Sequence, residues 1–368
     1  MQRAIVFNGK FLRARPTGVH RVAGELIRHV DQLLVRDGAA TGYSWSLLSP
    51  KDAHEPLALS AIERKAAGIS TWQFWEQLEL PRLARGAVLV NLCNLAPLTY
   101  SRSLTMIHDA QVFLSPMSYS PAFAAWYRFA LPRIGRSAAR IVTVSEYSRD
   151  RLEEFGVAPR DKISVIHNGI DHLDHVVADP AVLTRLALEP RTFVVVTAGA
   201  QKHKNVAVLF EAFKSPSLSH LTLVVVGADN EQAFREQDAT PPPGTIFAGR
   251  VSDGELRALY EQAACMVFPS TTEGFGLPPL EAMRLGCPVI VAPCGALPEV
   301  CGDAATYAHP NDPAAWVSGI LSLAEEGEMR RQSQARGRER AARYRWEDAG
   351  RKLLGLIVGV ASKAESPC

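Results

Sequence analysis

The chain has 368 residues, more than the roughly 250–300 at which one hydrophobic core usually stops growing, so its length favours two domains. Hydrophobic residues make up 47% and charged residues 21%, a composition that excludes a disordered, collagen-like or membrane-spanning chain. The formal net charge of +2 gives no electrostatic footprint for nucleic acid, so we expect no nucleic-acid partner.

Short apolar runs alternate with helical periodicity in the first half of the chain. The runs favour strands at 4–7, 44–48, 87–91, 104–107, 141–144 and 163–166, and the helical pattern covers 19–34 and 121–134. Strand–helix alternation is typical of a parallel α/β sheet, so residues 1–173 are expected to form one Rossmann-like, doubly wound domain.

The stretch 174–190 contains Pro180 and Pro190 and little strand pattern, and is therefore expected to be a linker. The alternation then restarts, which predicts a second Rossmann-like domain over 191–345. Its strands are expected at 193–197, 221–226, 245–247, 266–268 and 288–291, and its helices at 205–213, 253–264, 280–285 and 313–324. The last helix, within 346–368, follows a charged helix at 328–343, and the pattern leaves open which domain carries it.

Six scattered cysteines form no CxxC pair, which indicates reduced thiols rather than a zinc site or a disulfide framework. The first apolar run stops at Asn8, too early for a signal-peptide core. Both features predict a cytoplasmic protein.

A strand, a glycine loop and a helix follow one another at 265–283. The loop holds Gly274 and Gly276, and two prolines open the helix, where a missing N–H costs no helical bond. The amides of Phe275, Gly276 and Leu277 are expected to point out of the helix N-terminus, a place that favours a phosphate or diphosphate.

Glu273 lies on this loop and Glu281 in the first turns of the helix, so both carboxylates border the same mouth. Ionised carboxylates accept hydrogen bonds from hydroxyls. A sugar nucleotide offers diols on either side of an anionic diphosphate, which matches two acceptors around a nest of donors. Taken alone, Glu281 is equally well a helix-terminus residue with no ligand.

Glu273 and Glu281, with seven residues between them, resemble the EX7E motif of retaining GT-B glycosyltransferases of the family 4 type, the glycosyl transferases group 1. Coverage is nearly complete, from about residue 4 to 360. Further segments that fit the family are 17–21, 107–109, 144–148, 166–171, 249–252, 259–260 and 297–300.

This resemblance implies two Rossmann-like domains facing a cleft, with the acceptor on the N-terminal domain and the nucleotide sugar on the C-terminal domain. Glu273 would contact the donor sugar hydroxyls and Glu281 the ribose. The final helix would cross back to the N-terminal domain. The family needs no bound metal or other cofactor, and the sequence agrees in having no DxD-type carboxylate pair.

Without a metal, the leaving diphosphate needs a protein cation, and Lys204 follows the first strand of the second domain, where it reaches the strand's carboxyl end. A surface lysine is the alternative. The family usually has an arginine soon after the glycine equivalent to Gly199. In this sequence the corresponding segment, Ala200–His203, contains no arginine. Lys202 or Arg250 are the substitutes that we consider, and the resemblance places Gly199 at the donor.

His108 follows the apolar run 104–107, which puts it at a strand end, where a neutral imidazole can hydrogen-bond a donor sugar or the reacting groups. The resemblance favours this catalytic role over a structural one. Gly18 lies where a bare backbone can approach the diphosphate, although a plain tight turn fits as well.

Two other groups of residues were weighed. The histidine and acidic residues of 167–175 have a metal-like composition, but a turn before a linker explains them better, and we predict no metal site. The stretches 72–78 and 126–136 mix aromatic side chains with arginines or other polar residues; they fit an acceptor groove, a shallow membrane-surface contact, or a core with a basic rim.

The predicted function is retaining transfer of a hexose from a nucleoside-diphosphate sugar to a glycan or lipid-linked saccharide, in surface polysaccharide or lipopolysaccharide synthesis. The enzyme is expected in the cytoplasm, free or peripheral at the inner membrane. Two alternatives stay open: a non-catalytic partner subunit that binds nucleotide sugars, which the altered segment Ala200–His203 favours, and a GT-B nucleotide-sugar epimerase.

Overall fold

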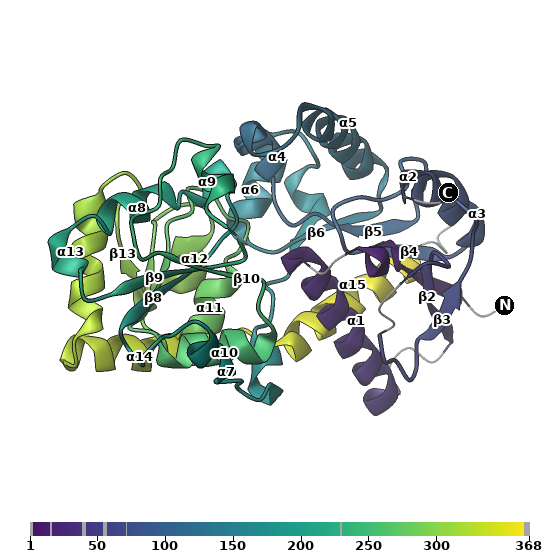
Figure 1. Ribbon diagram of the computed structural model, residues 1–368. Helices are drawn as coiled ribbons and strands as arrows, with labels where there is room; N and C mark the ends of the chain where they lie inside the picture. The colour runs from purple at the N-terminus through teal and green to yellow at the C-terminus, as the bar shows by residue number, and fades with distance from the viewer. Residues whose placement is uncertain are drawn as a thin grey trace. The chain divides into compact units, whose positions relative to one another are not determined.

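The computed structural model describes residues 3–14, 17–38, 42–53, 57–70, 72–228 and 230–363. The chain divides into two compact units (Figure 1). Unit 1 comprises Met1–Gly169 and Arg345–Cys368, and unit 2 comprises Ile170–Tyr344. Each unit contains one parallel sheet with helices between its strands, which confirms the α/β class and the two Rossmann-like, doubly wound domains predicted from the alternation.

Unit 1 is built on a seven-stranded sheet in the order β3-β2-β1-β4-β5-β6-β7, with parallel pairing throughout. The strand order reverses between β1 and β4, and in open α/β sheets ligands bind beyond the carboxyl ends of strands at such a switch point. The strands are β1 (Arg3–Asn8), β2 (Tyr43–Ser49), β3 (Glu63–Ala66), β4 (Val88–Asn91), β5 (Ser103–Met106), β6 (Arg140–Thr143) and β7 (Ile163–Val165).

All six apolar runs expected as strands in this part of the chain overlap one of these strands, but β3 was not expected. Its residues Glu63–Ala66 are all exposed, and among the described strands it pairs with β2 alone, at the sheet edge. An edge strand of this kind buries no apolar face, so it leaves no hydrophobic run in the sequence.

Helices of unit 1 come from both ends of the chain, because the final helix α15 packs against α1. Gly350 of α15 lies so close to His29 of α1 that an added Cβ would be 2.9 Å from the His29 Cβ. The helical elements are η1 (Lys10–Arg13), α1 (Gly18–Asp37), α2 (Trp72–Phe74), the π-helical turn η2 (Trp75–Glu79), α3 (Leu80–Leu83), α4 (Gln111–Leu114), η3 (Pro116–Ser118), α5 (Pro121–Ser137), α6 (Glu146–Glu154), η4 (Arg160–Lys162) and α15 (Trp346–Lys363).

Unit 2 repeats the same strand order in a six-stranded parallel sheet, β10-β9-β8-β11-β12-β13, with its switch point between β8 and β11. Its core packs around the fully buried side chains of Phe210 and Trp316. The strands are β8 (Phe193–Thr197), β9 (Thr222–Val226), β10 (Ile246–Gly249), β11 (Cys265–Phe268), β12 (Val289–Val291) and β13 (Thr306–Tyr307).

The stretch 174–190, expected as a linker, lies within unit 2 and packs against α10. Arg257 of α10 donates to the carbonyls of Leu173 and Val176 at 3.1 and 2.7 Å. The helical elements of unit 2 are η5 (Asp171–His175), α7 (Ala181–Arg185), η6 (Lys202–Lys204), α8 (Ala207–Ala212), η7 (Pro216–Leu218), α9 (Gln232–Arg235), α10 (Asp253–Gln262), α11 (Leu277–Arg284), α12 (Leu297–Cys301), η8 (Gly302–Ala304), α13 (Pro313–Ala324) and α14 (Glu328–Ala341).

Across the described ranges, no helix combines the length and the apolarity that crossing a membrane requires.

Candidate functional site

The loops that follow β8 and β11 meet at the switch point of unit 2. Asn205, in the left-handed conformation at φ 53°, donates its side-chain amide to the carbonyl of Pro310 at 2.7 Å and to that of Pro269 at 3.3 Å. The backbone N–H of Thr271 donates to the carbonyl of His203 at 2.8 Å. The bonds of Asn205 with Pro269 and of Thr271 with His203 hold the two loops together at the carboxyl ends of their strands, and the bond to Pro310 ties Asn205 to the segment after β13.

Glu273 and Lys204 lie together at this point. Lys204 Nζ is 2.7 Å from Glu273 Oε1, and the side chains are 23% and 14% exposed. The cation also lies 5.5 Å from the centroid of the Phe268 ring. Two residues that the sequence singled out separately, 69 positions apart, therefore form one partly buried ion pair.

Two glycines shape the backbone on either side of Glu273. Gly295 has φ +62°, and a Cβ there would lie 2.5 Å from the Glu273 nitrogen, so only glycine allows this approach. The amide of Ala296 donates to the Glu273 carbonyl at 3.0 Å. The segment after β12, which holds Gly295 and Ala296, thus fixes the position of the Glu273 backbone.

Gly276 is the N-cap of α11 with φ +102°, and a Cβ would lie 2.7 Å from the Leu297 side chain. The two residues after Leu277 are prolines, so the helix terminus itself offers an anion the amides of Gly276 and Leu277. Phe275, whose amide was also predicted to bind the anion, lies before the N-cap. Phe275 is 4% exposed and packs edge-on against Tyr344, with 5.6 Å between ring centroids. Gly274 completes the loop.

Glu281 is buried in the second turn of α11, at 6% exposure. Its Oε1 lies 3.4 Å from His172 Nε2 of η5. Tyr260 of α10 is close as well: burial first, and then the Glu281 carboxylate, raise the pKa of the Tyr260 hydroxyl, which shares a 2.9 Å hydrogen bond with Thr197. Groups from two other elements, η5 and α10, therefore lie close to Glu281.

The contact of His172 with Glu281 was not predicted. The residues 167–175 were interpreted as a turn before a linker, whereas η5 packs against α11. Arg284 lies three residues after Glu281 on the same helix. Its Nε donates a hydrogen bond to Asp174 at 2.9 Å. Glu281 and Arg284, three residues apart on one helix, and His172 and Asp174, two residues apart on η5, are opposite charges or hydrogen-bonding groups whose spacing in the sequence is compatible with this packing. Among the described residues, no three His, Cys, Asp or Glu side chains gather to hold a metal ion.

The remaining donor-site candidates of unit 2 follow strands of the same parallel sheet, at its carboxyl edge. Gly199 follows β8, and the atoms nearest to a Cβ there would belong to the flexible side chain of Gln201. Lys202 opens η6 and is exposed. Arg250 follows β10 directly and is exposed.

His108 lies in unit 1, two residues beyond β5, and is 5% exposed. Its Nε2 is 2.8 Å from the carbonyl of Leu92, and its backbone N–H donates to the Asn94 side chain at 2.8 Å. Burial lowers the pKa of His108 to about 4, against the opposing effect of the Leu92 bond. The ring is therefore neutral at pH 7, with Nε2–H donating to Leu92 and Nδ1 left as an acceptor.

Gly18, also in unit 1, is the first residue of α1 and is exposed. Among the described residues, nothing lies within 4 Å of a Cβ at this position, so its backbone is open to approach from this part of the structure. The structure thus groups Glu273, Lys204, Gly199, Arg250, the loop Gly274–Leu277 and Glu281 in unit 2, and His108 and Gly18 in unit 1.

Comparisons with known proteins agree with this architecture. A family model described as "Glycosyl transferases group 1" matches residues 185–340, and one described as "Glycosyltransferase Family 4" matches residues 80–172. The chain is 29% identical over 263 residues to the O-antigen chain mannosyltransferase B of Escherichia coli, covering 68% of this chain and 69% of that protein.

It is likewise 29% identical over 230 residues to the O-antigen chain mannosyltransferase RfbU of Salmonella typhimurium, covering 62% of each chain. The fold superposes on sucrose-phosphate synthase from Thermosynechococcus elongatus with a TM-score of 0.72, at 18% identity, over 98% of this chain and all of that one.

Two Rossmann-like units with these matches define a glycosyltransferase with the GT-B fold. The chain belongs to the family 4 type of these enzymes, the glycosyl transferases group 1, as the loop motif predicted. This membership argues for an enzyme rather than for a non-catalytic partner subunit.

Proposed function

We propose that the chain is a retaining glycosyltransferase that moves a hexose from a nucleoside-diphosphate sugar to a saccharide or lipid-linked saccharide in surface polysaccharide or lipopolysaccharide synthesis. The observation that carries the proposal is the Lys204–Glu273 ion pair at the switch point of unit 2. The O-antigen mannosyltransferases that the chain is similar to make mannose the sugar that we favour.

In this proposal, Lys204 and the amides of Gly276 and Leu277 stabilise the leaving diphosphate. Glu273 accepts hydrogen bonds from the donor sugar, and Glu281 from the ribose. The bond between the sugar C1 and the diphosphate oxygen breaks with its electron pair going to the diphosphate. The acceptor oxygen bonds to C1 from the same face, and its proton passes to the departing phosphate oxygen.

His108, neutral at pH 7, offers Nδ1 to a donor sugar hydroxyl as an acceptor, because Nε2 is committed to the Leu92 carbonyl. The approach of Gly18 to the diphosphate is part of the same proposal, with Gly199 and Arg250 as further donor contacts. No metal ion enters any step, so a chelator should leave the rate unchanged.

Nucleotide-sugar turnover tests this function directly. GDP-mannose, UDP-glucose and UDP-galactose would be incubated with and without lipid-linked and soluble saccharide acceptors, and nucleoside diphosphate release and the product's anomeric configuration would be measured. We expect acceptor-dependent release, an unchanged anomeric configuration, and no effect of EDTA. Isomerisation of a nucleotide sugar without an acceptor would instead identify an epimerase.

Replacing Glu273 by Gln should lower kcat at least about a hundredfold, because the residue is proposed to act on the reacting sugar. Glu281→Ala should mainly weaken nucleotide binding, by roughly tenfold. Glu211→Gln is the matched control, since Glu211 forms an exposed ion pair with Lys214 in the same unit. Wild-type turnover in both active-site variants would refute the proposed donor site.

We also propose a peripheral contact with an anionic membrane surface at the cytoplasmic face. Phe123 and Phe129 of α5 are 40% and 45% exposed, and the Arg133 guanidinium lies 3.6 Å from the Phe129 ring centroid. Exposed aromatics beside arginines suit an interface with anionic headgroups. Sedimentation with phosphatidylglycerol vesicles should carry the protein down, Phe129→Ser should reduce this, and equal binding to neutral vesicles would contradict the charge argument.

A further inference from the structure

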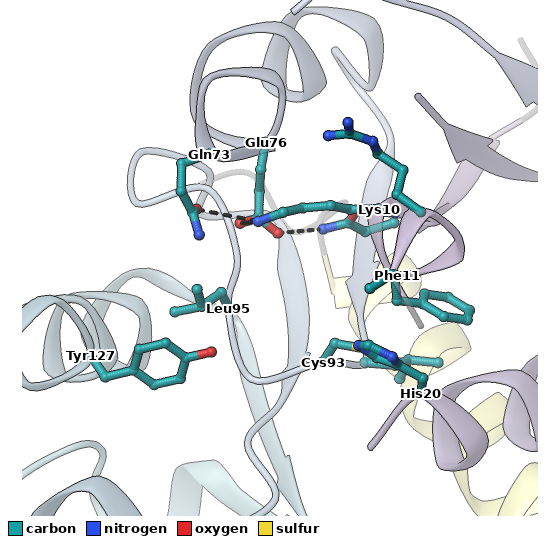
Figure 2. Close-up of a pocket in the computed structure, with 12 residues that line it drawn as sticks. Lys10, Phe11, His20, Gln73, Glu76, Cys93, Leu95 and Tyr127 are labelled. Atoms are coloured by element: carbon teal, nitrogen blue, oxygen red, sulfur yellow. Dashed lines mark hydrogen bonds and ion pairs between the residues drawn. The ribbon is translucent and has the colours of Figure 1, made fainter. Parts of the chain in front are cut away.

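A cavity also lies at the switch point of unit 1, and none of its lining residues belongs to the proposed donor site. Its volume is about 260 Å³. The carboxyl end of β1 contributes Asn8 and Lys10, the segment after β4 contributes Leu92, Cys93 and Leu95, and η2 and α5 supply further walls (Figure 2). A cavity at this point of an open α/β sheet is where such folds bind ligands.

The wall of the cavity holds a buried carboxylate. Glu76 lies in the π-helical turn η2 and is 3% exposed. Its Oε2 is 2.7 Å from Lys10 Nζ, and its Oε1 accepts from the Asn8 side chain at 3.0 Å. The pair is partly buried, since Lys10 is 20% exposed, and such a pair contributes little net stability because both ions lose hydration. π-helical turns, such as the one that carries Glu76, occur frequently at functional sites. A carboxylate has about four acceptor positions, and these two bonds use two.

Donor groups stand beside this acceptor. Lys10 Nζ also donates to Gln73 Oε1 at 3.2 Å (Figure 2). Counting the bonds within the described residues, one of the three N–H groups of Lys10 and the Gln73 NH₂ remain to donate to a ligand. Tyr127 of α5 directs its hydroxyl into the cavity and makes no hydrogen bond with another residue in the described part of the chain. Burial, and then the charge of Glu76, raise the pKa of this hydroxyl, so it stays protonated and can donate.

The charges in the cavity are matched, which decides the kind of ligand. Lys10 is paired with Glu76, and Arg13 with Asp52. An anion such as a phosphate would have to displace a carboxylate from one of these cations. An uncharged polyol needs no such exchange, because each hydroxyl both donates to Glu76 and accepts from Lys10, Gln73 or Tyr127. Phe11 and Leu95 supply apolar surface for the carbon face of a ring.

We propose that this cavity binds one uncharged sugar ring of the saccharide acceptor, with Glu76 accepting from its hydroxyls and the Tyr127 hydroxyl donating to one of its oxygens. The assignment rests on the proposed function, since it concerns the acceptor of that transfer. Lys10 holds the Glu76 carboxylate in place, so it acts as a positioning residue for the ring.

Saturation-transfer NMR on the full chain tests the binding directly. The probes are the methyl glycosides of mannose, glucose, galactose and N-acetylglucosamine, with inorganic phosphate as a charged competitor. We expect transfer to at least one glycoside that phosphate does not displace. No transfer to any of the four, or displacement by phosphate, overturns the proposal.

Two variants locate the bound ring. Tyr127→Phe removes one unpartnered hydroxyl and keeps the ring stacked on Phe123, so the fold is retained, and the glycoside Kd and acceptor KM should rise roughly fivefold. Glu76→Gln should raise both by roughly tenfold or more. Glu63→Gln, an exposed carboxylate of β3 paired with Lys65, is the control and should change neither.

Donor binding separates this inference from the proposed function. Both cavity variants should keep the wild-type Kd for the nucleoside diphosphate, measured by calorimetry. If nucleotide sugars are consumed but the Tyr127→Phe and Glu76→Gln variants keep the wild-type acceptor KM, the cavity assignment fails and the transferase stands. If no nucleotide sugar binds or turns over, the proposed function fails, while the glycoside measurement still reports on the cavity.

Discussion

At the scale of single residues, His108 makes the protein sensitive to acid. Its pKa in the folded state is lowered by burial from the ordinary value of 6.5 to about 4. Between these values the unfolded chain binds the proton and the folded chain does not, so stability falls as pH falls through this window. Above pH 6.5 the His108 ring is neutral in both the folded and the unfolded state, so its titration no longer lowers the stability of the folded chain.

Replacing His108 by Asn, which keeps an N–H group near the Leu92 carbonyl, should remove this dependence. From pH 6.5 to 4 the wild type is expected to lose up to roughly 3 kcal/mol more unfolding free energy than the variant, measured by urea titration at each pH. Parallel curves for the two proteins would show that His108 titrates normally in the folded state.

His172 gives a second residue-scale prediction. It lies 3.4 Å from Glu281 and restricts the carboxylate that is proposed to bind the ribose. His172→Ala should raise the Kd for a nucleoside diphosphate several-fold, in calorimetry, and change kcat less than KM for the donor. His175→Ala, an exposed position on the same turn η5, is the control. Equal Kd values for the two variants would leave His172 without a role at the site.

Site residues that the sequence predicted are positioned by the order of the strands, whereas those it missed are positioned by the packing of short turns. Glu273 and Lys204 follow adjacent parallel strands, and such strand ends meet at one edge of the sheet. Their contact could therefore be anticipated from order along the chain. His172 reaches Glu281 through the packing of η5 on α11, and Glu76 reaches Lys10 through the π-helical turn. Neither placement leaves a periodic pattern.

At the scale of elements, apolar runs predicted the central strands because these are buried on both faces. β8 and β11 are examples, with four buried residues each. β3 and β13 are edge strands with exposed residues, and their sequences lack such runs. The hydrophobic pattern also could not predict which unit α15 packs against, because an apolar stripe on a helix fits any apolar partner surface.

The packing of α15 on α1 supports a paired test. Gly350→Ala places a Cβ 2.9 Å from the His29 Cβ, and overpacking of this kind costs about 1–3 kcal/mol. Gly355 lies in the same helix with nothing within 4 Å, so Gly355→Ala should instead stabilise the protein by about 0.5–1 kcal/mol. Thermal unfolding should move in opposite directions for the two variants, and a shared direction would contradict the close contact.

At the scale of the whole molecule, unit 1 is assembled from the two ends of the chain. Its sheet comes from the first 169 residues, while α15 arrives only after the entire second unit has been made. Each unit has its own parallel sheet, which predicts that sequence neighbours such as α14 and α15 belong to different cooperative structures.

Native-state hydrogen exchange under rising denaturant shows whether α15 unfolds with unit 1 or with its sequence neighbour α14. The amides of α15 should lose protection together with those of α1 and β4, which it contacts, and not with those of α13 and α14, which precede it. In Gly350→Ala, exchange should accelerate in α1, β4 and α15 while β8, β9 and β11 keep their wild-type rates. If α15 follows α14 in both proteins, the final helix draws its stability from unit 2, and the division of the chain at Arg345 is wrong.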